Sequence, residues 1–251
     1  MINVTWPDKP VVLDFEDIDV WMMSSYNCHL SQQQMYMYKK KPGETTLYYS
    51  CQALFPDKDL SSAALGVYAF TGADTVEAFF GCGKVGVWNR INKLKDSNMR
   101  AAMQDLGMNT LAAEKLLHQL EKFVVRIVYN DPVSQNLASA RARKWRQSEK
   151  DDSARLPPDY DSFVQHYLRA HLQFYEWRHA HQVESLDPSE FGWHLENDEL
   201  HPTMYELAAL PDQLEYSASV CDFDVSSKDS DGDDDICIDE SSDESTDEED
   251  D

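Results

Sequence analysis

Three carboxylates stand where they could hold a metal ion. Asp17 and Asp19 follow the apolar run VVLDF at 11–15, and Asp74 lies in the glycine-marked stretch T-G-A-D-T. Acids at the carboxyl end of a strand face the crevice where α/β proteins bind ligands, and hard oxygen ligands suit Mg²⁺ or Mn²⁺ and phosphoryl chemistry. The alternative is local: Asp17 and Asp74 as helix N-caps and Asp19 as a first-turn acid.

A second group of residues could bind an anion. Gly81, Gly83 and Gly86 have the spacing G-x-G-x-x-G, which is typical of dinucleotide-binding turns. That interpretation needs a strand before Gly81, but the preceding stretch TGADTVEAFF favours a helix. A Walker A motif is also excluded, because Val85 follows Lys84 where Ser or Thr is required. The remaining interpretation from the pattern is a tight turn between two short helices.

Hydrophobic periodicity predicts the elements that position these residues. A buried strand is expected at 11–15, a helix at 19–30, and a pair of neighbouring strands at 34–42 and 45–51 separated by P-G-E. From Asp59 onward the period becomes helical, and the clearest helices are at 110–129 and 162–180. His166 and His171 lie five residues apart in the second of these, which favours a packing role for both.

The arrangement as a whole resembles a known family. The stretch YAFTGADTVEAFFGCGKVGVWNRI looks like the H-A-F-T-G-C-D-T-x-x-x-F-x-G-x-G-K-x-x-x-W signature of mobile-element-associated animal proteins with a PIN-like, flap-endonuclease-like nuclease core. Three later stretches, LEKFVVRIVYND, LPPDYDSFVQHYLRAHLQFYEW and SEFGWHLENDELHP, resemble further segments of that family in the same order. The resemblance covers roughly residues 11–202.

The resemblance implies a fold and a set of roles. The fold would be α/β: a partial PIN-like parallel sheet, then a helix-rich body with a helix-two-turn-helix element, then a disordered acidic tail. Asp17, Asp19 and Asp74 would be catalytic and would bind Mg²⁺ or Mn²⁺. The turn at Gly81, Gly83 and Lys84 would hold a phosphate of duplex or branched DNA, with a monovalent cation in some relatives.

Departures from the family pattern bear on activity. Tyr68 replaces the usual His, Ala73 the usual Cys and Ile18 the usual Thr. The family's first strand with its own Asp, and its later Glu/Asp helix, have no counterpart, so we expect an N-terminally truncated remnant that is weak or inactive alone as a Mg-dependent phosphodiesterase. The strand at 11–15 would then have an exposed edge.

Composition divides the chain. We expect the nuclease-like core at 1–100, a helical extension at 101–221 and an acidic tail at 222–251. Sixteen acids and a single lysine give the tail −15 of the net charge of −24, which leaves −9 for the rest. Such a segment cannot bury enough apolar surface to fold alone.

Within the tail, Ile236, Ile238, Asp239 and Glu240 form a short apolar and acidic peptide that resembles a SUMO-interaction motif. Such a peptide would add a strand to a partner's sheet. A generic solvating tail, or one that binds a basic protein, is the alternative. The tail also suggests a second functional class, a non-catalytic nuclear interaction protein.

Five scattered cysteines without a C-x-x-C pair indicate neither a disulfide framework nor a zinc cluster. The N-terminus has no signal-peptide pattern and no apolar run is long enough to span a membrane. We therefore expect a nuclear or cytoplasmic protein.

Overall fold

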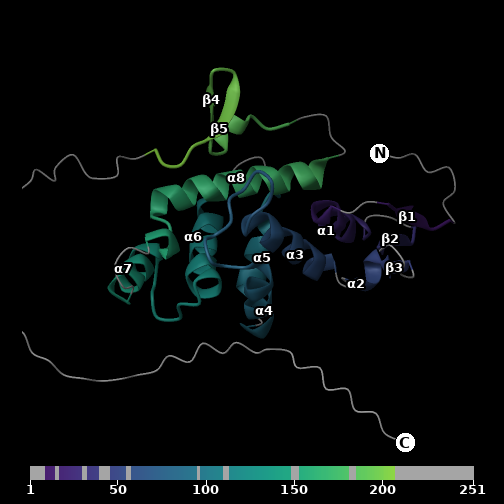
Figure 1. Cartoon of the computed structure of the whole chain (residues 1–251), viewed down its shortest axis with the longest axis horizontal. Helices are drawn as coiled ribbons and strands as arrows, with labels where there is room; N and C mark the ends of the chain where they lie inside the picture. The colour runs from purple at the N-terminus through teal and green to yellow at the C-terminus, as the bar shows by residue number, and fades with distance from the viewer. Residues whose placement is uncertain are drawn as a thin grey trace, which may run out of the picture. The chain divides into compact units, whose positions relative to one another are not determined.

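The computed structural model of the chain describes residues 9–14, 17–29, 33–39, 46–54, 58–94, 97–109, 113–147, 153–180 and 185–206. By contacts the chain divides into Met1–Ala209 and Leu210–Asp251. All described residues belong to the first unit, which is mixed α/β with helices dominating and two small sheets (Figure 1). The tail residues Ile236, Ile238, Asp239 and Glu240 lie outside the described residues.

The first sheet has three described strands in the order β1-β2-β3. β1 (Val11–Leu13) runs parallel to β2 (Met35–Lys39), and β3 (Leu47–Ser50) is antiparallel to β2. The predicted strands and their hairpin are confirmed, but β1 is shorter than predicted and half-exposed rather than buried, and the sheet is mixed rather than parallel. Among the described strands β1 stands at an edge. The small core beside this sheet consists of buried Cys28, Met37 and Cys51, and both cysteines are free thiols.

Helices make up the body of the unit. α1 (Ile18–Asn27) connects β1 to β2, and α2 (Cys51–Leu54) follows β3. The others are α3 (Lys58–Phe70), α4 (Lys84–Leu94), α5 (Ser97–Asp105), α6 (Glu114–Phe123), a π-helical turn (Val124–Val128), α7 (Leu137–Gln147) and α8 (Tyr160–His179). Short 3₁₀ turns at Ser153–Arg155 and Pro188–Glu190 precede α8 and the hairpin of β4 (Trp193–Glu196) and β5 (Glu199–Pro202). No described helix has both the length and the apolar character needed to cross a membrane.

A cluster of aromatic rings forms the main core. Phe70 at the end of α3 contacts Phe79, Phe123, Phe163 and His166, with ring centroids 5.1–6.5 Å apart. Its members come from both sides of residue 100, so the expected core and extension share one packed interior. Burial of such rings is the main contribution to stability here.

Two helix predictions differ from the structure. The predicted short helix between Asp74 and Gly81 is absent: residues 71–83 instead contain two turns between α3 and α4. The predicted helix at 110–129 begins only at Glu114 and ends as the π-helical turn. Helix 162–180 is confirmed as α8, whose stripe buries Phe163, Tyr167, Ala170 and Phe174.

His166 gives the fold a pH dependence. The ring is 7% exposed and its Nε2–H donates to the carbonyl of Phe70 at 2.8 Å. Burial lowers the pKa of His166 to about 4, although the Phe70 carbonyl and the charge of Glu77 oppose the shift. Between about pH 6.5 and about pH 4, His166 is therefore protonated in the unfolded chain but neutral in the folded chain.

We expect the free energy of unfolding to fall by about 3 kcal/mol as pH drops from about 6.5 to about 4 because of this histidine. Urea unfolding at several pH values measures the slope. In His166→Gln, whose side-chain amide can replace Nε2–H as the donor to the Phe70 carbonyl, a large part of the slope should vanish; an unchanged slope would contradict the assignment. Burial also lowers the pKa of His171, which adds a smaller part.

Candidate functional site

The first acids are positioned by the N-terminus of α1. Asp17 is the N-cap, and its Oδ1 accepts the N–H of Asp19 at 2.9 Å. Asp19 lies in the first turn and its Oδ1 accepts the hydroxyl of Tyr68 from α3 at 2.5 Å. The local capping role is thus present for Asp17, while Asp19 connects two helices.

Lys84, the first residue of α4, lies beside the same group. Its ammonium stands 3.5 Å from the centre of the Tyr68 ring and donates to the carbonyls of Tyr68, at 3.2 Å, and Gly72. Burial lowers the pKa of Lys84, and the negative charges of Asp19 and Asp74 oppose that change. Burial, and then the Asp19 hydrogen bond and the surrounding acids, raise the pKa of Tyr68. Three acids and one ammonium therefore act on one tyrosine.

Asp74 lies at the tip of the first turn after α3. A two-way backbone bridge between Ala73 and Val76 closes this turn, and Thr75 donates to Gln173 of α8. Gly72 has φ +121, and a Cβ there would lie 3.0–3.1 Å from Ala78. Only glycine fits. The exposed Asp74 carboxylate makes no hydrogen bond or ion pair with a described residue.

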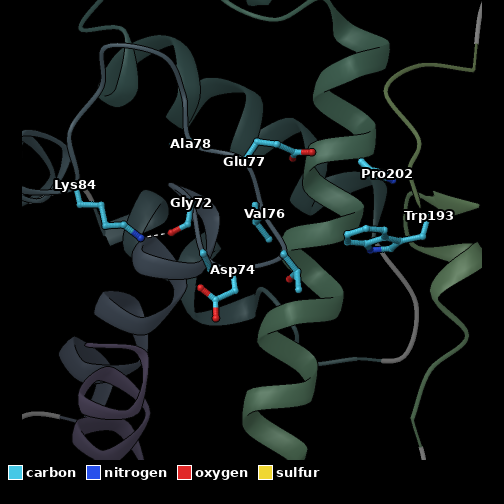
Figure 2. A pocket seen from close by; sticks show the side chains of 10 residues that line it. Gly72, Asp74, Val76, Glu77, Ala78, Lys84, Trp193 and Pro202 are labelled. Atoms are coloured by element: carbon cyan, nitrogen blue, oxygen red, sulfur yellow. Dashed lines mark hydrogen bonds between the residues drawn. The ribbon is translucent and has the colours of Figure 1, made fainter. Parts of the chain in front are cut away.

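An open pocket of about 490 Å³ separates Asp74 and Lys84 from the β4–β5 hairpin. Figure 2 shows Lys84 directed at the Gly72 carbonyl, the Asp74 carboxylate close by, and Trp193 and Pro202 entering from the hairpin. Sequence reasoning did not select these hairpin residues, although the G-W-x-x-x-x-x-x-L-x-P stretch carried part of the resemblance.

The hairpin is fixed to the pocket by a buried arginine. Arg169 of α8 is 3% exposed and donates to the carbonyls of Gly192, at 3.1 Å, and Thr203, at 2.6 Å, and to the carboxylate of Glu77 at 3.0 Å. A buried charge needs such partners. Glu77 and Arg169 therefore have a structural role in holding the pocket wall.

The acids do not form a metal site as they stand. In the part of the chain that is described, no three Asp, Glu, His or Cys side chains gather closely enough to hold a metal ion. Asp17 is occupied with capping, Asp19 with Tyr68, and the Lys84 ammonium already supplies a positive charge to Asp19 and Asp74. The arrangement is an acid–tyrosine–lysine cluster, in which the attraction between Lys84 and the acids is satisfied internally.

No family model, curated protein or solved structure gives a significant match to the chain.

The glycine turn faces a different pocket from Lys84. Gly81, with φ +71, and Gly83 line a cavity of about 640 Å³ together with Arg90, Lys144 and Arg155. A Cβ added to either glycine would meet nothing within 4 Å. Packing therefore does not require glycine at 83, and the open backbone is accessible to a ligand.

The structure thus brings Asp17, Asp19, Asp74 and Lys84 together and leaves Gly81 and Gly83 with another set of cations. Sequence reasoning missed Tyr68 as their common partner and missed α7, which supplies Lys144. For α7 a signal was present in the run ARARKWRQ at 140–147, which is strongly basic within an acidic chain.

Proposed function

We propose that the chain is a DNA-binding protein with a PIN-like, flap-endonuclease-like core derived from a mobile-element nuclease, weak or inactive alone as a hydrolase. One observation carries the proposal. Three carboxylates act on Tyr68: those of Asp17 and Asp19, which follow β1, and that of Asp74, about fifty residues later. Asp19 and Asp74 also act on Lys84, which directly follows the open glycine turn. The parallel β1-α1-β2 unit and the two turns before α4 support the same fold.

The glycine turn supplies the phosphate site. Main-chain N–H groups at Gly81 and Gly83 can approach an anion closely, since no side chain of either residue intervenes. The N-terminus of α4 adds its positive dipole end. Arg90 and Lys144 in the same cavity attract a polyanion. The resemblance also implies a monovalent cation at this turn, which would bind main-chain carbonyls and a phosphate oxygen.

The acid cluster explains weak hydrolysis. Two-metal cleavage of a phosphodiester needs carboxylates that coordinate two cations about 4 Å apart. If Mg²⁺ or Mn²⁺ bound Asp17, Asp19 and Asp74, the hydrogen bond from Tyr68 to Asp19 would have to break. The Lys84 ammonium would also have to move away from Asp19 and Asp74. Lys84 would then contact a phosphate from the acid side, opposite the glycine turn.

The full chain should bind a fluorescein-labelled DNA duplex that carries a single-stranded flap, and should cleave it negligibly with Mg²⁺ or Mn²⁺. Anisotropy measures binding and gel electrophoresis measures cleavage. Asp74→Asn is the control, and it should leave both unchanged. Rapid metal-dependent cleavage that Asp74→Asn abolishes would show a complete active site, and failure to bind DNA would refute the proposal.

A second candidate is a non-catalytic nuclear interaction protein that acts through residues 222–251. The composition of this segment favours the candidate, because it holds sixteen acids and a single lysine. Ile236, Ile238, Asp239 and Glu240 would bind a SUMO-like partner or a basic protein. If deletion of residues 222–251 left every captured partner bound, this candidate would be rejected.

A further inference from the structure

α7 is a basic helix in an acidic chain. Leu137–Gln147 contains Arg141, Arg143, Lys144 and Arg146 and no acid. A run of cations without intervening acids repels itself unless an anion neutralises it. The helix therefore requires either internal acidic partners or an external polyanion.

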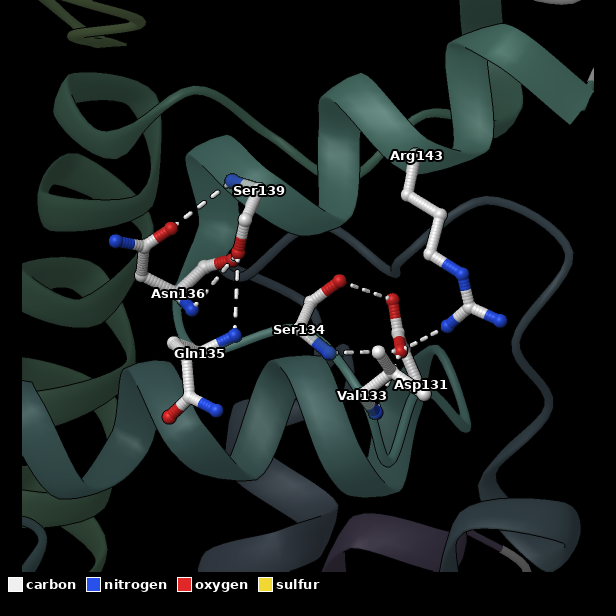
Figure 3. Close-up of polar contacts among 7 residues, drawn as sticks. All are labelled: Asp131, Val133, Ser134, Gln135, Asn136, Ser139 and Arg143. Carbon is white, nitrogen blue, oxygen red and sulfur yellow. Dashed lines mark hydrogen bonds and ion pairs between the residues drawn. The ribbon is translucent and has the colours of Figure 1, made fainter.

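Part of the charge serves to fix the helix. Arg143 pairs with Asp131, which also accepts the N–H of Ser134 at 3.1 Å and its hydroxyl at 2.6 Å (Figure 3). Arg141 donates to the carbonyl of Pro157 at 2.5 Å. These two arginines are tethers between α7 and the segments on either side of it.

The start of α7 is equally well held. Asn136 Oδ1 accepts the N–H of Ser139 at 2.9 Å (Figure 3). The buried Glu121 accepts the N–H of Leu137 at 3.0 Å. Such capping satisfies the free N–H groups of a helix end. α7 is consequently a fixed platform.

Two cations remain available on this platform. Lys144 and Arg146 are exposed and make no hydrogen bond or ion pair with another described residue. Between them Trp145 is 59% exposed. Exposed aromatic rings among cations are typical of surfaces that contact nucleic acid. Of the two cations, Lys144 lines the glycine-turn cavity, whereas Arg146, two residues later, points to another side of the helix and lines neither cavity beside α7.

A continuous groove connects α7 to the glycine turn. The glycine-turn cavity of about 640 Å³ adjoins a smaller one of about 190 Å³, because Tyr129, Asn130 and Lys144 line both. Asp131 is the one acid among the lining residues, and it is neutralised by Arg143. Near the turn, the positive charges of Arg90 and Lys144 oppose the rise that burial causes in the pKa of Cys82. The groove is positive along its length.

We propose that Lys144 of α7 binds a second stretch of the DNA backbone, which runs along this groove from the phosphate at the glycine turn. This inference rests on the proposed function, since it assumes that DNA is the polyanion. Lys144 lines both cavities of the groove, and its charge and the open glycine backbone complement a phosphate chain. Arg141 and Arg143 hold α7 in place, and Lys144 makes the contact.

The test compares two charge-matched variants of the full chain. Lys144→Gln removes the proposed contact. Lys115→Gln removes one exposed cation from α6, outside the groove. Binding of the flap-bearing duplex is followed by anisotropy over a salt series, and thermal unfolding shows that each variant is folded.

We expect the α7 variant to bind about fivefold more weakly near 0.1 M salt, with the slope of log K against log salt reduced by about 1. The α6 variant should stay within about twofold of the wild type, because long-range charge alone is screened. Equal behaviour of the two variants would overturn the inference while the proposed function stands, provided that the wild type binds. A wild type that does not bind would overturn both.

Discussion

Replacing Gly66 by alanine is expected to lower the free energy of unfolding by about 3 kcal/mol or more. Gly66 lies inside α3, where α5 and α8 approach most closely. A Cβ built there would stand 2.1 Å from the carbonyl oxygen of Met103 and 3.1 Å from the Phe174 ring. Neither the backbone of α5 nor the packed ring can retreat without moving a helix. Overpacking therefore outweighs the roughly 1 kcal/mol by which alanine is favoured over glycine in helices.

Gly86 in α4 provides the matched control. There the nearest atom to an added Cβ is the Arg90 guanidinium at 3.5 Å, an ordinary contact. Gly86→Ala should be neutral or stabilise the fold by up to about 1 kcal/mol. Urea unfolding followed by tryptophan fluorescence measures both variants. If Gly66→Ala proved as stable as Gly86→Ala, the result would contradict the close contact between α3 and α5 at Gly66.

Removing residues 222–251 is expected to strengthen DNA binding by about tenfold at low salt. This segment carries −15 of the net charge of −24, so its removal takes away most of the negative charge that repels DNA. Because the effect is electrostatic, it should fade as salt rises. Anisotropy titrations of the shortened and full chains at several salt concentrations provide the measurement.

A full-length variant with the tail acids changed to Asn and Gln separates charge from chain length. It should behave as the shortened chain does. If both the deletion and the neutral tail bound DNA as weakly as the wild type, the acidic segment would have no influence on the groove, and its role would lie with other partners.

Periodicity was sufficient to predict several elements. The stripe of Phe163, Tyr167, Ala170 and Phe174 recurs at helical spacing and is buried as predicted in α8. The short β-branched run before Asp14 forms β1, and the P-G-E break separates two antiparallel strands. These features depend on residues that are close in the sequence, which is why local patterns reveal them.

The site depended on contacts that no local pattern contains. The Asp19–Tyr68 hydrogen bond joins residues 49 positions apart, and the direction of the Lys84 ammonium is set by two carbonyls and a ring from α3 and its turn. The sequence grouped Lys84 with the glycines beside it, whereas the structure places its ammonium with the acids. Likewise, the missing helix after Asp74 reflects Gly72 and the Thr75–Gln173 contact, which fix that segment as a turn.

Substitution of Gly83 shows whether DNA binds at the glycine turn. Asp and Asn are both favourable residues before a helix, so Gly83→Asp and Gly83→Asn should fold equally well. The space beside Gly83 accepts either side chain. They differ in a single negative charge placed where a phosphate should sit.

The measurement is the affinity of the full chain for the flap-bearing duplex, by anisotropy at one fixed salt concentration, for the wild type and both variants. We expect Gly83→Asp to bind DNA at least about tenfold more weakly than Gly83→Asn, with the same unfolding temperature. Equal affinities for all three proteins would contradict DNA binding at this turn.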